Sequence, residues 1–160
     1  MSNTQSMCTS FMGELMTATH NFGTAPIRAA STADTFKAAL YLTTATVNAS
    51  TTAYSATGEV SSSGTNYTAG GVTVTNATAP TATNSSATAG VAFWTPSASI
   101  TYSNVTLTTA FDAMLVYNST QSNKAVSVHT FGAQTITAGT FTLTMPSNTT
   151  STALLRLATT

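Results

Sequence analysis

The stretch from Phe111 to Pro146, FDAMLVYNSTQSNKAVSVHTFGAQTITAGTFTLTMP, has the clearest pattern in this 160-residue sequence. An apolar run over 111–117 is followed by a polar, turn-like segment and then by apolar/polar alternation over 125–131. Gly132 interrupts the alternation, and a third run covers 136–145. Alternation of period two between clusters of Asn, Ser and Gly is typical of antiparallel strands joined by turns. The stretch therefore predicts a three-stranded meander.

Outside this stretch, the clearest strand is FKAALYL, residues 36–42. Gly70-Gly71 is expected to form a turn in which both glycines adopt positive φ, and 77–90 is expected to be a surface loop. Further short apolar runs lie between turn signals at 72–76, 91–94, 100–102, 105–108 and 154–157. About eight short strands without βαβ alternation predict an all-β fold, an antiparallel β-sandwich or jelly roll.

The N-terminal part of the chain predicts one short helix over 9–20. Its apolar residues recur at helical spacing and are Phe11, Met12, Leu15 and Met16. A helix this short is not stable by itself, so its apolar face must dock on the protein's own sheet or on a neighbouring subunit. We divide the chain into an N-terminal arm with helix and linker, residues 1–34, and a β-sandwich domain, residues 35–160.

Charged residues are scarce, and this excludes several classes of function. They make up 5% of the chain, with zero net charge, against about 25% in an average domain. Such a surface cannot bind nucleic acid through clustered Lys and Arg, and zero net charge favours self-association. The single cysteine, Cys8, cannot form an intrachain disulfide. The sequence also shows neither an apolar run long enough to span a membrane nor a signal peptide.

The residues that could carry chemistry are few and scattered. His20 and His129 are the only histidines, and neither has a carboxylate or cysteine at the spacing of a zinc site. A Ser-His-Asp triad using His129 and Asp112 can be drawn, but no Gly-x-Ser-x-Gly motif supports it. No phosphate-binding glycine motif is present. We therefore expect no catalytic residue, no metal and no cofactor, and we expect Trp94 to lie in the core or at an interface.

An ordered set of short motifs runs through the chain from about residue 8 to residue 157. The motifs are Cys8-Thr-Ser-Phe11, His20-Asn21-Phe22, FKAALYL (36–42), GTNYTAGGV (64–72), LVYNS (115–119) and NKAV (123–126). In this order they resemble a family of small virion structural proteins of tailed bacteriophages, which includes capsid cement (decoration) proteins. The segment 76–103 departs most from the family pattern.

The resemblance implies a non-enzymatic cement protein, made in the host cytoplasm, on the outer capsid surface of the virion. It would bridge major capsid proteins and stabilise the DNA-filled head. Its partners would be the major capsid protein and itself, as a homo-dimer or homo-trimer, with no nucleic acid and no membrane. The expected interface consists of the N-terminal segment and the strand around the single tryptophan, with Phe11, Met12, Leu15, Met16, Phe22 and Trp94.

Two alternatives stay open at this point. A tail, neck or fibre component of a phage virion, with a glycan-binding tip, would form trimers at low copy number. A virion-associated polysaccharide hydrolase would need two carboxylates in one cleft, and the scarcity of acids and histidines argues against it.

Overall fold

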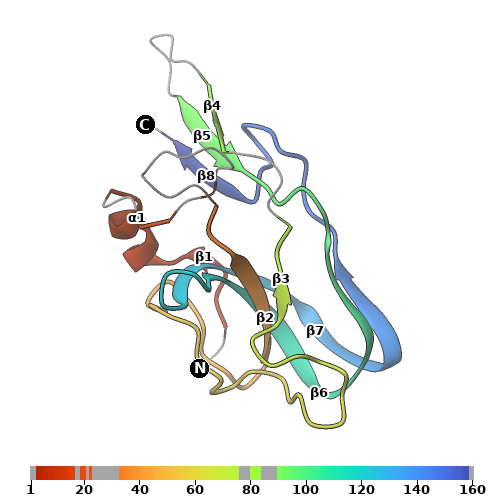
Figure 1. The fold of residues 1–160 in the computed structure, drawn as a ribbon. Coiled ribbons are helices and arrows are strands. Elements are labelled where there is room, and N and C mark those ends of the chain that lie inside the picture. Colours follow the sequence, from red (N-terminus) through yellow and green to blue (C-terminus); the bar gives the residue numbers. More distant parts are fainter. Residues whose placement is uncertain are drawn as a thin grey trace.

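A computed structural model describes residues 3–16, 19–20, 22, 33–75, 80–83 and 90–158 of the protein. In these residues the elements are, in order, β1 (Ser6–Met7), α1 (Thr9–Met16), β2 (Phe36–Leu42), β3 (Val72–Thr73), β4 (Thr81–Ala82), β5 (Val91–Trp94), β6 (Ile100–Asn118), β7 (Lys124–Leu143) and β8 (Leu155–Ala158). The strands form two antiparallel sheets (Figure 1), in the orders β1-β7-β6-β2-β3 and β4-β5-β8. The prediction of a mostly β, antiparallel fold is confirmed.

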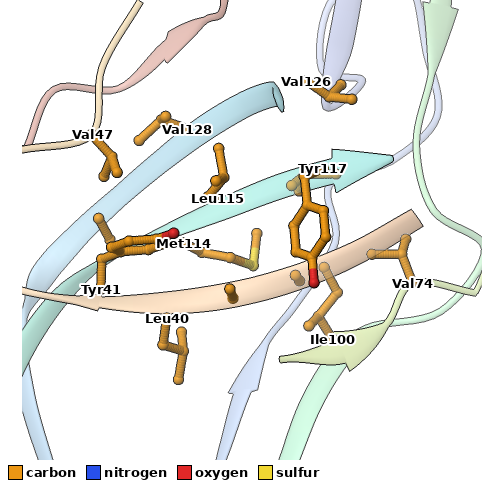
Figure 2. Close-up of a cluster of buried hydrophobic side chains, with 14 of the residues drawn as sticks. Leu40, Tyr41, Val47, Val74, Ile100, Met114, Leu115, Tyr117, Val126 and Val128 are labelled. Atoms are coloured by element: carbon orange, nitrogen blue, oxygen red, sulfur yellow. The ribbon is translucent and has the colours of Figure 1, made fainter. Parts of the chain in front are cut away.

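Strand β2 lies inside the five-stranded sheet, and its bounds are those predicted for FKAALYL. It pairs with β6 along its whole length and with β3 near its start. Leu40 and Tyr41 point to opposite faces because side chains alternate along a strand, and both are almost fully buried. Figure 2 shows the residues on the Tyr41 side of β2, among them Val47, Leu115 and Val128. Both faces of this sheet are therefore covered.

The predicted three-stranded meander is wrong. Strands β6 and β7 form one long hairpin around the turn at 119–123. The run 136–143, expected as a third strand, continues β7 and pairs with the first half of β6, as in Ile136 with Leu107. Gly132, the expected break, stays within the strand, and no atom lies near the position of its missing Cβ.

The β6–β7 hairpin is sharply bent in its middle (Figure 1). The rings of Phe131 and Phe141 lie 5.2 Å apart, although ten residues of a straight strand would separate them by about 33 Å. Both rings also contact Phe111 edge to face. The pairing of β6 with β7 shifts register several times between Tyr102 and Ala113, and such irregularities allow a ribbon to bend. The bend brings the Tyr102 hydroxyl onto the carbonyl of Ala38 in β2.

All five tyrosines of the chain use their hydroxyls to hold loops or strands onto the large sheet. Tyr54 and Tyr67 both donate to the carboxylate of Glu59, at 2.7 and 2.8 Å. Tyr117 donates to the carbonyl of Gly70 at 2.7 Å. Tyr41 donates to the carbonyl of Ser55, and burial raises the pKa of Tyr41 to about 12. The long loop between β2 and β3 is thus fixed by its own side chains and by tyrosines of β2 and β6.

Two segments differ from the expectation in a smaller way. Strand β4 lies within the predicted 77–90 loop, and β1 precedes α1 and adds the outermost strand to the large sheet beside β7. Both strands are two residues long, and two residues are too few to show period-two alternation. The Gly70-Gly71 turn is as predicted, with φ of 82° and 76°.

Replacement of Gly71 by Ala is expected to lower the free energy of unfolding by about 3 kcal/mol or more. The new Cβ would overlap the carbonyl group of Ala38, at a φ of 76° that is itself strained for alanine. Gly64→Ala is the matched control, because Gly64 has a φ of 69° with no atom near its Cβ position, so a cost of about 1 kcal/mol is expected. Urea unfolding of both variants measures the difference; equal losses would show that the Ala38 contact is unimportant.

Candidate functional site

Four of the six residues expected at an interface come together in one apolar groove. It lies between α1, the residue Phe22 and the strands β5 and β8, and its volume is about 80 Å³. We call it the apolar groove; its main lining residues are Phe11, Leu15, Phe22, Trp94, Leu155 and Leu157. These residues are distant in sequence, and the groove forms because α1 docks beside the three-stranded sheet.

The aromatic residues form the floor of this groove. Phe11, Phe22 and Trp94 are 2%, 7% and 2% exposed. The rings of Phe22 and Trp94 lie 4.9 Å apart, and Phe22 stacks on Phe36 at 4.4 Å. Leu15 is half-buried against this core. Their part in an interface stays a prediction, and the predicted Met12 and Met16 side chains lie outside the described residues.

A second, wider groove adjoins the first between β1 and β8. Its volume is about 340 Å³, and it is lined by residues 5–7, 127–129 and 153–156. We call it the edge groove. Met7, Leu155 and Arg156 line both grooves. β1 is the last strand of the large sheet, and β8 is the last strand of the small one. Sequence reasoning missed this site because it depends on how the two sheets are placed.

The edge groove also holds a hydroxyl–imidazole pair. Ser127 Oγ lies 2.9 Å from His129 Nε2, and burial lowers the pKa of His129 to about 4. The Asp112 carboxylate, which completed the triad drawn from the sequence, instead accepts a hydrogen bond from Asn3. An imidazole that is neutral across ordinary pH and lacks a carboxylate partner among the described residues is a weak general base.

A polar cluster attaches the N-terminal residues to the β6–β7 turn. The Glu14 carboxylate on α1 lies 2.6 Å from Lys124 Nζ and 2.7 Å from His20 Nε2. On its other side, the imidazole of His20 lies 3.0 Å from the side-chain amide of Asn118, which also donates to Asp34 at 2.8 Å. We call these five residues the polar clamp. His20, Asp34 and Asn118 are buried, so the clamp fixes α1 as one wall of the apolar groove.

The clamp also fixes the protonation state of His20. Asn118 Oδ1 accepts the backbone N–H groups of Thr120 and Gln121, so its Nδ2 must be the atom facing His20. His20 Nδ1 is therefore an acceptor, and Nε2 carries the proton toward Glu14. Burial lowers the pKa of His20, against the opposing effect of Glu14. Burial acts to raise the pKa of Glu14, but hydrogen bonds and charge from Lys124 and His20 lower it overall.

Acidification is expected to destabilise the protein through the clamp. A histidine whose pKa falls below 6.5 on folding binds fewer protons than in the unfolded chain, so stability falls as the pH drops from about 7 to about 5. His20→Gln keeps a donor and an acceptor but cannot be protonated, and it should reduce this loss. Urea unfolding at both pH values measures it. His129 has a pKa that burial also lowers, so His129→Gln should remove a separate part of the loss and leave the His20 contribution intact. The double variant should therefore lose less stability than either single variant, and an unchanged pH dependence in His20→Gln would contradict the assignment.

Phe11 is expected to contribute far more to the free energy of unfolding than Leu15, which lies on the same helix and also lines the apolar groove. Phe11→Ala removes a ring that is 2% exposed and should cost about 3–5 kcal/mol. Leu15→Ala removes a half-buried side chain and should cost about 1 kcal/mol. Thermal unfolding compares the two variants. Similar small losses would mean that α1 does not form part of the core.

In the part of the chain that the structure describes, no group of three or more His, Cys, Asp or Glu side chains could hold a metal ion. Cys8 is buried, which raises the pKa of its thiol to about 11 and keeps it protonated at neutral pH. No helix among the described residues is long and apolar enough to span a membrane. Comparison with known proteins yields no match to a family model, to a curated protein or to a solved structure.

Proposed function

We propose that the protein is a non-enzymatic structural component of a phage virion, a capsid cement (decoration) protein that binds the outer capsid surface. It would bridge major capsid proteins and stabilise the DNA-filled head. The observation that carries the proposal is the apolar groove with the adjoining edge groove, which would serve as a binding surface on a protein with few charges and zero net charge. The motif order in the sequence supports the same function.

The state of the acidic residues supports a binding role over catalysis. Glu14 and Asp34 belong to the polar clamp, Glu59 accepts bonds from two tyrosines and Asp112 accepts one from Asn3. These are the four acidic residues of the chain, and each has a structural partner. A hydrolase of polysaccharides needs two carboxylates that face its substrate. We therefore infer that the protein is not an enzyme.

We also infer that the two sheets belong to a β-sandwich with a helix-bearing N-terminal arm. The bend of the β6–β7 hairpin supports this, because it folds one half of the ribbon over the face of β2, where Tyr102 reaches Ala38. Strands that pass between layers at a bend or bulge are a known feature of sandwiches. The jelly-roll topology, the boundary after residue 34 and a homo-dimer or homo-trimer stay predictions.

The tail, neck or fibre alternative with a glycan-binding tip has less support. Sugars stack on exposed aromatic rings, whereas Trp94 is 2% exposed and Tyr41, Tyr67, Tyr102 and Tyr117 are all at most 3% exposed. Tyr54 stacks on Tyr117 and donates to Glu59. The described tyrosines and tryptophan thus serve packing and loop attachment.

Binding to purified shells tests the proposed function. Particles that lack the protein, incubated with an excess of it and sedimented, are expected to bind hundreds of copies in simple ratio to the shell protein, because symmetry repeats one site over the lattice. Quantitative mass spectrometry of the pellet measures the ratio. The loaded heads should also retain their DNA at a higher temperature than bare heads. A dozen copies, or binding only to tails, would contradict the cement function and favour a tail or fibre component.

A further inference from the structure

The imidazole of His20 links α1 to the β6–β7 turn through both of its ring nitrogens. Nε2 lies 2.7 Å from the Glu14 carboxylate on α1, and Nδ1 lies 3.0 Å from the side-chain amide of Asn118 at the end of β6. The backbone N–H of Thr19 also donates to the carbonyl of Glu14 at 2.9 Å, which ties the residues around His20 to the helix. His20 is 8% exposed, so this link between helix and sheet is buried.

The link requires a neutral imidazole, with one nitrogen as donor and the other as acceptor. Asn118 Nδ2 donates to Nδ1 of His20 and also to Asp34 at 2.8 Å. The amide cannot turn to offer its oxygen instead, because Oδ1 accepts the backbone N–H groups of Thr120 and Gln121. Protonation of Nδ1 would therefore set two donors against each other and break the attachment of His20 to the sheet.

Three charged groups among the described residues act on His20: Glu14 on α1, Asp34 ahead of β2 and Lys124 on β7. Burial has the largest effect and lowers the pKa of His20 below its usual 6.5; Lys124 adds to this effect, and the two carboxylates oppose it without outweighing it. Burial acts to raise the pKa of Glu14, but its contacts with Lys124 and His20 lower it overall. A fall from about pH 7 to about pH 5 thus acts on His20 while Glu14 keeps its charge.

The helix can move away from the turn without the loss of a strand pair. The pairing of β2 with β6 and of β6 with β7 involves no residue of α1. Ahead of the helix, β1 pairs with β7, and the N–H of Cys8 donates to the carbonyl of Val126 at 3.1 Å, so the helix stays tethered. The contact of 2.6 Å between Glu14 and Lys124 persists under mild acid, so opening becomes more frequent rather than complete.

We propose that the polar clamp is a pH-sensitive latch, in which protonation of His20 releases α1 from the β6–β7 turn and opens the apolar groove. The released helix would uncover Phe11 and Leu15, which line that groove. An imidazole that leaves its buried site binds a proton more readily than the docked one, so the open state gains population as the pH falls below about 6.5. The inference stands on the geometry of the clamp and does not depend on the proposed function.

The single cysteine of the chain can report this opening. The Cys8 thiol is 0% exposed, and burial together with the nearby Glu14 carboxylate raises its pKa to about 11. Labelling with a dipyridyl disulfide, normalised to the rate of the urea-unfolded protein at the same pH, should be about threefold or more faster at pH 5 than at pH 7. In His20→Gln, which cannot be protonated, the normalised rate should change little. His129→Gln is the matched control and should keep the wild-type ratio.

The dependence on urea separates opening of α1 from unfolding of the whole protein. Low concentrations of urea should accelerate the labelling of Cys8 only weakly at pH 5, because release of one helix exposes little surface. Exchange of the backbone amides of β2 should instead follow the full urea dependence of unfolding. Equal dependences would mean that the reagent reaches Cys8 through global unfolding, and this result overturns the latch.

The remaining outcomes are equally decisive. A normalised labelling rate that does not change with pH in the wild type overturns the latch, as does a pH effect that persists in His20→Gln or is lost in His129→Gln. Nitrogen NMR of the wild type keeps the test independent of whether His20→Gln folds. The latch requires a proton on Nε2 of His20 and none on Nδ1 at pH 7, and a proton on Nδ1 at that pH overturns it.

Discussion

The bend in the β6–β7 hairpin is the constraint on which most of the fold depends. Phe111, Phe131 and Phe141 contact one another on the inside of the bend, and these ring contacts offset part of the loss of regular pairing at the register shifts. Because the ribbon folds back, two strands provide cover for the same sheet that they help to build. A straight hairpin would leave one face of β2 exposed to water.

The polar clamp has a comparable role for the apolar groove. Helix α1 has eight residues, and a helix of that length forms only when tertiary contacts hold it. Glu14 and His20 supply these contacts at the β6–β7 turn, and Phe11 supplies the apolar one. The turn of the hairpin thus determines where the helix lies, and the helix in turn forms a wall of the apolar groove.

The scarcity of charge gains a physical meaning from the structure. Acidic side chains are used as internal attachments for loops and for the N-terminal segment, as Glu59 is for the loop between β2 and β3. Such a protein has little long-range electrostatic attraction for a partner, so the binding that we propose would depend on shape and apolar contact.

The sequence by itself determined the strand class of the chain, the bounds of FKAALYL and the positive φ of Gly70-Gly71, because these follow from local periodicity and from glycine's lack of a Cβ. It also predicted an interface set of Phe11, Met12, Leu15, Met16, Phe22 and Trp94, and it left open whether Trp94 lies in the core; the structure shows that Phe11, Phe22 and Trp94 are buried. Only the tertiary structure decided that 124–143 is one bent strand, that His20 joins Glu14 to Asn118, and that α1 lies beside the small sheet to form the apolar groove. The reason is that bending, long-range hydrogen bonding and sheet placement depend on contacts between residues far apart in sequence, which no local pattern records.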